Sequence, residues 1–218
     1  VKLNFEGPHS IKVDGGYLKA IGTEKDSITI TGISWRGIDV KSAGSEIKYA
    51  RIIDEGNSGQ GDYLVKLFGS HIDNSHIFGG YRGVELRDSS IVSRSRIHDI
   101  RKEAVSAYER SVAYGNIIYD VGTEEEWSPA VMSYDRSYIV NNRIYSTMQN
   151  PNMVAVGSQN GGYIGGNTIG ADRGIHGKFG IFIREGNDIT VEDNRIGGFK
   201  TNVALIGTKP VFEGNTFM

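Results

Sequence analysis

Short apolar segments recur along the chain about every 23 residues. From residue 116 onward, each repeat carries an Asn two positions before an apolar anchor, and a second apolar residue lies five positions before that anchor. The anchors are Ile33, Ile52, Ile77, Ile97, Ile118, Ile144, Ile169, Ile196 and Phe217, and the residues five positions earlier are Ile28, Ile47, Ile72, Val92, Ala113, Ile139, Ile164, Val191 and Phe212. The segments are short, alternating and β-branched, as in 28–30 and 181–183, and none sustains the spacing of a helix. The pattern predicts a solenoid of strands.

A third apolar segment precedes each of these units. Its inward pairs are Ile38/Val40, Val65/Leu67, Val84/Leu86, Val105/Ala107, Val131/Ser133, Val154/Val156, Ile181/Ile183 and Val203/Leu205. The distance from this segment to the next unit is nearly constant, whereas the distance from each anchor to the next segment varies, so one corner of the coil is predicted to hold the length variation. Asn tolerates a left-handed backbone, which predicts a sharp bend at the Asn residues themselves. These are Asn116, Asn142, Asn167, Asn194 and Asn215.

Three short strands per coil, an Asn-type bend and one variable corner resemble the right-handed parallel β-helix of pectate-lyase-like proteins over nearly the whole chain. We therefore expect an all-β, single-domain right-handed parallel β-helix of about nine coils over residues 23–218. Residues 1–22 fit the repeat poorly, and an irregular first coil or an N-terminal cap is expected there.

Composition excludes several classes of function. The 218 residues are 38% hydrophobic and carry 24 Lys+Arg against 26 Asp+Glu without charged blocks, so no electrostatic footprint for nucleic acid is present. No apolar run approaches the roughly 20 residues of a membrane span, and the chain is expected to be soluble. The first residue is Val rather than Met, which indicates a processed or excised piece. The absence of Cys excludes disulfides and thiolate metal sites.

Outward positions of the third segment gather cations, rings and carboxylates. Alternate residues of a strand point to opposite faces, and the predicted outward positions are Asp39, Lys66, Glu85, Ser106, Met132, Ala155, Phe182 and Ala204 in one row and Lys41, Phe68, Arg87, Tyr108, Tyr134, Gly157, Arg184 and Ile206 in the next. Asp88, Glu109 and Asp135 follow at the bend. A sheet face of this kind beside long loops predicts a groove for a polysaccharide, whose ring faces pack on aromatic side chains.

Two cations in adjacent coils suggest elimination chemistry on a uronic acid. Lys66 lies in Leu-Val-Lys and Arg87 in Val-Glu-Leu-Arg, and this resembles the Lys and Arg pair of the chondroitinase B and alginate lyase family. The resemblance implies Lys66 as base and Arg87 as the group that neutralises the sugar carboxylate. We expect Tyr108 and Tyr134 beside them as ring platforms or proton donor. Where that family continues with His-Gly-Asn, this chain has Asp-Ser-Ser at 88–90. The predicted register pairs Lys66 with Glu85.

Ca²⁺ is the one cofactor left open, and no metal ligand is assigned. Acidic residues near Lys66, namely Asp54, Glu55 and Asp62, are off the spacing that the family uses. The histidines lack acidic partners at metal spacing, so a zinc site is not expected.

Hydrolysis by paired carboxylates is the second chemistry that fits. Asp88, Glu109 and Asp135 lie on successive predicted coils, with Glu85 in the same coil as Asp88, and carboxylates one or two strands apart bracket the separations of retaining and inverting glycosidases. The expected substrate contacts are Tyr134, Asp135, Arg184, Phe68, Trp127 and His98. His98 precedes Asp99 and fits either a general base or a side chain that holds its loop.

A non-catalytic β-helix is the alternative from a different class. In such an adhesion, surface or phage-tail module the same groups would form a solvated face. We expect a polysaccharide partner, neither nucleic acid nor membrane, a monomer or homotrimer, and an extracellular location on the substrate argument alone.

Overall fold

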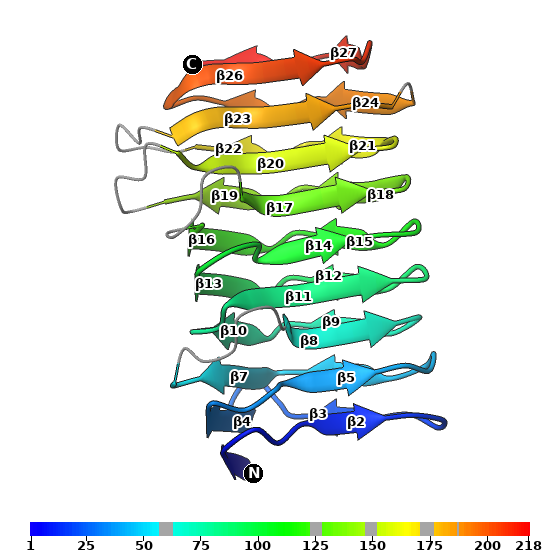
Figure 1. Ribbon diagram of the computed structural model, residues 1–218, viewed down its shortest axis with the longest axis vertical. Helices are drawn as coiled ribbons and strands as arrows, with labels where there is room; N and C mark the ends of the chain where they lie inside the picture. Colours follow the sequence, from blue (N-terminus) through cyan, green and yellow to red (C-terminus); the bar gives the residue numbers. More distant parts are fainter. Residues whose placement is uncertain (57–62, 123–127, 147–151, 171–176, 187) are drawn as a thin grey trace.

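The chain folds into three parallel β-sheets that wrap around one axis. The computed structural model describes residues 1–56, 63–122, 128–146, 152–170, 177–186 and 188–218, which form 28 strands. Every strand pairing is parallel, and the chain visits the sheets in the repeating order A, B, C (Figure 1). None of these described residues belongs to a helix that could cross a membrane.

Sheet A contains β1 (Lys2–Glu6), β4 (Ile28–Ile33), β7 (Ala50–Asp54), β10 (His76–Phe78), β13 (Arg96–Ile100), β16 (Ile117–Val121), β19 (Arg143–Tyr145), β22 (Thr168–Ile169), β25 (Arg195–Ile196) and β28 (Thr216–Phe217). Sheet B contains β2 (Ile11–Val13), β5 (Ile38–Val40), β8 (Tyr63–Phe68), β11 (Arg82–Arg87), β14 (Val105–Ala107), β17 (Pro129–Tyr134), β20 (Val154–Gln159), β23 (Gly177–Arg184) and β26 (Phe199–Ile206). Sheet C contains β3 (Lys19–Ile21), β6 (Glu46–Lys48), β9 (His71–Asp73), β12 (Ile91–Ser93), β15 (Val112–Tyr114), β18 (Ser137–Val140), β21 (Gly162–Gly165), β24 (Ile189–Glu192) and β27 (Val211–Glu213).

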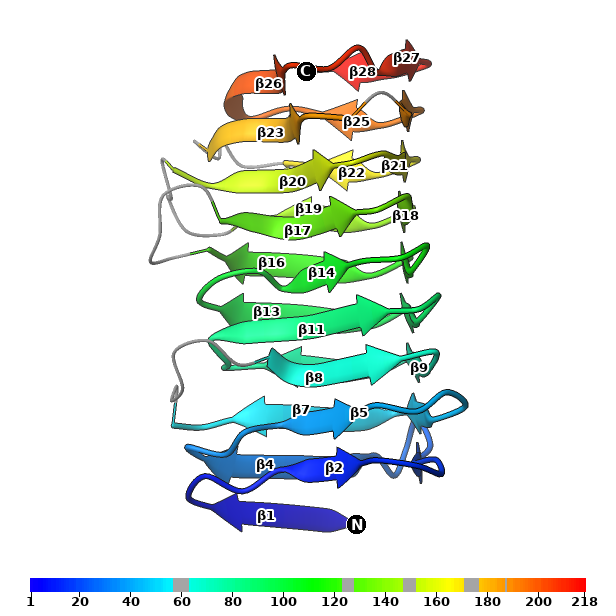
Figure 2. The ribbon, with the colours of Figure 1, turned by 45° about the vertical axis from the view of Figure 1, so that its right-hand side comes forward.

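The coil is right-handed. In Figure 1 the near strands of sheet B run to the right and the far strands of sheet A run back to the left while the chain climbs from N to C. Figure 2 shows the same opposed directions for β11 and β13 or β14 and β16. The expected all-β, single-domain right-handed parallel β-helix is confirmed, with nine strands stacked in each of sheets B and C.

The predicted repeat is confirmed from the second coil onward. Anchors from Ile52 to Phe217 pair with one another in sheet A, and Ile47 to Phe212 pair in sheet C. Most of these side chains are fully buried, so the stacked rows of Ile and Val form a continuous apolar core. Burial of such side chains stabilises a fold by about 1.5–3 kcal/mol each.

The first predicted coil was misaligned. Ile30 rather than Ile33 pairs with Ile52, and Ala20 rather than Ile28 pairs with Ile47. Residues 22–27 separate β3 from β4, whereas later coils have one or two residues at this corner, so a fixed five-residue spacing chose the wrong positions. Residues 1–22 supply β1, β2 and β3, each paired with the strand above it.

The corner between sheets C and A is built differently from the prediction. The left-handed residue is the one before each Asn, with φ of 55° at Asn141 and 64° at Gly115 and Gly166. The Asn itself is buried and links coils. The amide Nδ2 of Asn142 donates to Ala113 O and to Asn167 Oδ1, and Asn167 Oδ1 also accepts the backbone N–H of Asn142. Asn is therefore needed for its side-chain hydrogen bonds rather than for its backbone freedom.

In the coils nearer the N-terminus, Ser takes the place of Asn at this corner and makes the same kind of hydrogen bond between coils. The backbone N–H of Ser75 donates to Ser95 Oγ at 3.1 Å, and that of Ser95 donates to Asn116 Oδ1 at 2.9 Å. One buried side-chain oxygen per coil thus satisfies a backbone donor of the coil below it.

Length variation falls at the corner between sheets A and B, as predicted. Residues 55–62 and 146–153 separate successive strands of sheets A and B, whereas from the second coil onward the C-to-A corner has one or two residues, such as the pairs 74–75 and 141–142. The position where sheet B begins after this corner was mispredicted in one coil. Gly157, not Ala155, pairs with Met132 and Phe182, and Gln159 pairs with Tyr134.

Candidate functional site

The outer face of sheet B carries two parallel rows of polar and aromatic side chains. The first row runs Asp39, Lys66, Glu85, Ser106 and Met132, and the second runs Phe68, Arg87, Tyr108 and Tyr134. Lys66 pairs with Glu85, as the sequence predicted, and Arg87 pairs with Phe68. Lys66 and Arg87 therefore occupy diagonal positions on adjacent strands, within reach of long side chains.

Carboxylates of the protein neutralise Arg87. Its Nε lies 2.5 Å from Glu85 Oε1, and its Nη1 lies 3.8 Å from Glu109 Oε1. The guanidinium also lies over the Tyr108 ring, 4.4 Å from the centroid. Arg87 is thus held in one orientation by contacts of two kinds.

The two tyrosines stack on each other. The Tyr108 and Tyr134 centroids are 4.5 Å apart with an interplanar angle of 5°. Because Arg87 comes from the strand below and Tyr134 from the strand above, both faces of the Tyr108 ring are covered. Between these two expected ring platforms, only Tyr134 keeps a face that points away from the stack.

Tyr63 belongs to the same cluster and was not identified from the sequence. Its hydroxyl donates to Ser106 Oγ at 3.0 Å, and Arg82 lies 5.4 Å from its ring centroid. The Arg82 Nε is in turn 2.9 Å from Glu103 Oε2. Tyr63 begins its strand at the variable corner, where the repeat gives no register, so the spacing contains no signal for it.

Burial raises the pKa of all three tyrosines of this cluster. The pKa of Tyr63 rises to about 12 because its hydroxyl is largely desolvated. Burial, together with neighbouring tyrosines and Glu85, raises the pKa of Tyr108, and burial with Glu103 raises that of Tyr134. These hydroxyls stay protonated at neutral pH and are suited to donate a proton or a hydrogen bond.

Three of the expected catalytic or binding carboxylates lie in the turns between sheets B and C. Asp88, Glu109 and Asp135 have φ of 51°, 55° and 49°, and each is followed by a second residue with positive φ. Glu109 Oε2 accepts the backbone N–H of Asp88 at 3.2 Å. The left-handed region favours Asp among non-glycine residues, so the turn conformation alone explains part of this acidic pattern.

A hollow of about 500 Å³ opens on sheet B beyond the tyrosine stack. It lies over β17, β20, β23 and β26, where Gly157 contributes no side chain between Met132 and Phe182. Tyr134, Phe182 and Arg184 are among its lining residues. The misaligned coil concealed this hollow from the sequence analysis, because the prediction placed Ala155 at the position that Gly157 occupies.

The remaining predicted contacts are dispersed. Phe68 is 40% exposed at the lower end of its row, and Arg184 lies 3.3 Å from Glu185 beside the hollow. Asp135 Oδ1 accepts a long hydrogen bond of 3.5 Å from Asn160 Nδ2. His98 is on β13, so it belongs to the outer face of sheet A. Trp127 lies outside the described residues.

The acidic residues that could have held Ca²⁺ near Lys66 do not converge. Asp54 is buried and accepts the backbone N–H of Gly56, and Glu55 accepts a hydrogen bond from the Thr31 hydroxyl. Asp62 lies outside the described residues. Across the described ranges, no three His, Asp or Glu side chains are placed to bind one metal ion. Asp54 and Glu55, the described acidic residues near Lys66, therefore do not fit a Ca²⁺ site.

No protein-family model matches this chain, and no curated protein matches it in sequence. Solved structures do resemble it. The periplasmic alginate epimerase AlgG is 12% identical with a TM-score of 0.55, over 98% of this chain and 61% of AlgG. The A-module of the mannuronan C-5 epimerase AlgE4 of Azotobacter vinelandii is 14% identical with a TM-score of 0.48, over 96% of this chain and 68% of the module.

The catalytic unit of a GH87 α-1,3-glucanase from Streptomyces thermodiastaticus is 10% identical with a TM-score of 0.40, over 100% of this chain and 57% of that unit. The present chain spans about three fifths of the length of AlgG. At 12% identity the likeness to AlgG extends to the fold, which is the parallel β-helix expected from the repeat.

Proposed function

We propose that this protein binds an extended, uronic-acid-containing polysaccharide along the outer face of sheet B and cleaves it by β-elimination. One observation supports this most. Cations and rings occupy successive strands of sheet B, from Lys66 and Arg87 through the Tyr108–Tyr134 stack, and this row ends at the hollow lined by Tyr134, Phe182 and Arg184. Rings and cations in one groove match the apolar faces and carboxylates of such a polymer. AlgG, which shares the fold, is described as an alginate epimerase.

Each step of the elimination has a candidate group on this face. The Lys66 amine removes the proton next to the sugar carboxylate, while Arg87 binds and neutralises that carboxylate. Glu85 binds the Nε of Arg87 and Glu109 lies 3.8 Å from Nη1, so a substrate carboxylate would bind at Nη2 or displace Glu109. The protonated Tyr108 hydroxyl gives its proton to the leaving glycosidic oxygen as the C–O bond breaks and the C=C bond forms.

The test follows the ultraviolet absorbance of unsaturated uronides during incubation with alginate, polygalacturonate and chondroitin. We expect Lys66→Ala to abolish the rise. Lys12→Ala is the matched control because Lys12 lies in the same row two strands below. A rise that Lys66→Ala retains would remove Lys66 from the mechanism, and no rise on any uronide polymer would contradict elimination.

A non-catalytic polysaccharide-binding module is the second candidate, and a specific observation favours it. Arg87 is already neutralised by Glu85, and Tyr108 has both ring faces covered. These groups stabilise one another without any ligand. Binding of polygalacturonate with unchanged polymer length, measured by light scattering over a day of incubation, would support this module in place of the lyase.

A further inference from the structure

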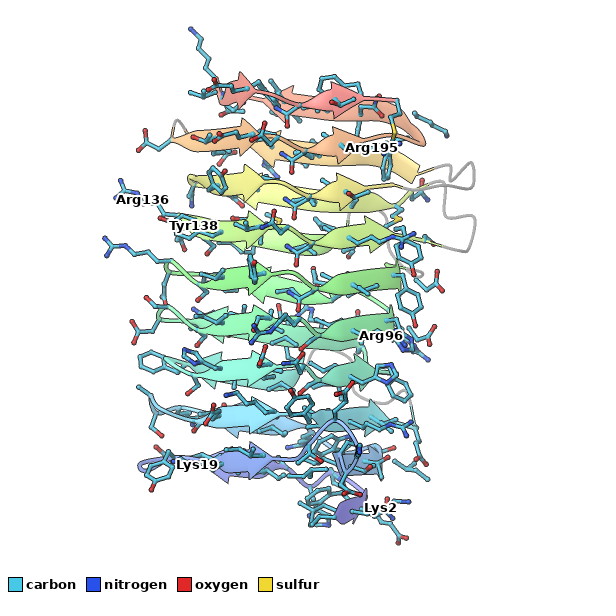
Figure 3. The ribbon with its side chains drawn as sticks, turned by 180° about the vertical axis from the view of Figure 1, so that it is seen from behind. Lys2, Lys19, Arg96, Arg136, Tyr138 and Arg195 are labelled. Carbon is cyan, nitrogen blue, oxygen red and sulfur yellow. The ribbon has the colours of Figure 1, made fainter. Side chains whose placement is uncertain are left out.

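A row of cations follows the outer face of sheet A from one end of the rod to the other. Its members occupy every second strand: Lys2, Arg51, Arg96, Arg143 and Arg195. Figure 3 shows Lys2, Arg96 and Arg195 one above another on the same side of the molecule. The strands between them carry Thr29, His76, Ile117 and Thr168 at the same register position. No position of this row up to Arg195 is therefore acidic. We call it the arginine row.

The charges of the arginine row recur at a regular interval. Neighbouring strands of a sheet are about 4.8 Å apart, so cations on every second strand are roughly 9–10 Å apart. The row also runs along the axis of the rod, perpendicular to the strands. A ligand that engages several of its members must be extended and must carry anionic groups at a similar interval on one side.

The central cations of the row have no carboxylate partner. Within the part of the chain that the structure describes, neither Arg51 nor Arg96 forms an ion pair. His76 lies between them in the register. Burial lowers the pKa of His76 to about 4, and the charges of His98, Arg96 and Arg51 lower it further in the same direction.

A groove of about 510 Å³ accompanies these cations. Arg51, His76 and Arg96 line one side, and the C-to-A corner with Tyr49 and Asn74 lines the other. Thr23 and Ser27 add hydroxyl groups, which suit the hydroxyls of a sugar. Arg94 also lines the groove, but Asp73 binds its guanidinium at two points, 2.8 and 2.6 Å. Glu24 is the one acidic side chain among the described residues of the lining.

An aromatic stack beside the row helps to identify the ligand. Phe78, His98, Tyr119 and Tyr145 lie on successive strands, with ring centroids 5.1, 4.5 and 5.3 Å apart and interplanar angles of 5° to 12°. Their faces cover one another, so their edges point outward. Single-stranded nucleic acid binds by stacking its bases on free aromatic faces, and duplex DNA presents one phosphate per 3.4 Å of each strand. Neither matches this surface.

We propose that the arginine row and its groove form a second binding site, for an anionic polysaccharide that lies along the rod on sheet A and turns the carboxylate or sulfate of every second sugar toward the row. This site is separate from the sheet B face and does not depend on elimination chemistry. It would hold a long chain on the molecule while another part of that chain occupies sheet B, which raises the local concentration of polymer there.

The test compares the binding of three polymers to the intact protein by isothermal titration calorimetry: polygalacturonate for carboxylates, dextran sulfate for sulfates and dextran as the neutral polymer. The double variant Arg51→Gln/Arg96→Gln removes the two unpaired charges. Arg110→Gln/Arg136→Gln is the matched control, since it removes the same charge at the B-to-C corner, on the opposite edge of the rod from Arg96 in Figure 3. Both variants should keep the native melting temperature.

We expect the first double variant to bind one anionic polymer about tenfold more weakly at low salt, and the control to bind it within about twofold of the native protein. The polymer that loses affinity identifies the anion as carboxylate or sulfate. Equal losses in the two variants would show a non-specific charge effect and overturn the proposal. So would equally tight binding of oligodeoxythymidylate with the same sensitivity to Arg51→Gln/Arg96→Gln, which would identify a nucleic-acid site.

A separate readout distinguishes this site from the sheet B face. If the lyase assay is positive, Arg51→Gln/Arg96→Gln should leave the rate on uronide trisaccharides unchanged, because so short a substrate cannot reach both faces. If this variant instead lowers both the rate on trisaccharides and the affinity for the polymer, these arginines belong to the same site as Lys66, and the proposal of a second site is overturned.

Discussion

The outer faces of sheets A and B both carry stacked aromatic rings and cationic side chains, but they differ in whether the cations form ion pairs. Each face has a stack of rings beside cationic side chains. On sheet B, Arg87 binds Glu85 and Arg82 binds Glu103. On sheet A, Arg51 and Arg96 have no carboxylate partner among the described residues.

This difference separates stability from recognition. A cation paired within the fold contributes to stability and must exchange a partner before it binds a ligand, whereas an unpaired exposed cation adds little stability and is ready to attract an anion. The net charge of minus two and the absence of basic blocks hid this asymmetry. Regular spacing across strands, rather than clustering along the chain, concentrates the positive charge on sheet A.

The largest expected effect comes from breaking a pair on sheet B. Glu103→Gln removes a charge partner of the partly buried Arg82 guanidinium, and we expect the free energy of unfolding to fall by about 2 kcal/mol. Differential scanning calorimetry would then show a melting temperature about 4–8 °C lower. Glu24→Gln in the sheet A groove is the control and should leave the melting temperature unchanged. Equal effects of the two substitutions would contradict the contrast between the faces.

An intermediate effect is expected from His76, which is partly buried among cations on sheet A. The pKa of His76 is lowered to about 4 by burial first and by His98, Arg96 and Arg51 next. Between about pH 6.5 and pH 4 the unfolded chain binds a proton at this residue and the folded chain does not. Stability should therefore fall by about 1.5 kcal/mol as the pH is lowered through this window, less than the full pKa difference would give because solvent screens this half-buried ring, without a further loss from His76 below it.

Melting temperatures measured from pH 7 to pH 4 check this expectation. His76→Gln should remove most of the slope in that window, whatever its effect at pH 7. His71→Gln serves as the control because His71 is exposed on sheet C. If the slope persists in His76→Gln, the groups that titrate in this window lie elsewhere in the molecule.

The smallest effect is expected from single arginines. Arg51→Gln should change the free energy of unfolding by less than about 0.5 kcal/mol, since it is an exposed side chain without an ion pair. Arg87→Gln should cost about 1 kcal/mol through its contacts with Glu85 and the Tyr108 ring. Equilibrium urea unfolding measures both. A larger loss for Arg51→Gln would mean that sheet A depends on its row for stability.

Much of the fold could be predicted because it follows from local repetition. The core positions from Ile47 onward recur at nearly fixed intervals, and a parallel β-helix is the arrangement that stacks them. The prediction failed where spacing ceased to be informative. Residues 22–27 lengthen one corner, and the predicted register of the first coil was wrong for that reason. The long A-to-B corner before β20 shifted the predicted register of that strand by two positions, so that Ala155 was assigned the place of Gly157. A shift of two keeps the alternation of faces, so nothing in the pattern revealed the error.

The candidate site was predictable only in part, for the same reason. The sequence identified Lys66, Arg87 and Tyr108 as outward-facing neighbours, and the pairing of Lys66 with Glu85 is confirmed. It could not reveal that Arg87 is bound by a carboxylate or that Tyr108 lies between two partners, because rotamers decide such contacts. The roles of these residues stay predictions.

By itself, the sequence determined the coil from the second one onward: three short strands, apolar residues inside, a short C-to-A corner and a variable A-to-B corner. These features are local, since each depends on alternation and spacing within about one repeat. Only the tertiary structure decided what the stacking brings together. Arg51, Arg96, Arg143 and Arg195 are far apart in the chain, yet they form one row because register between coils, and not distance along the sequence, sets which side chains share a face.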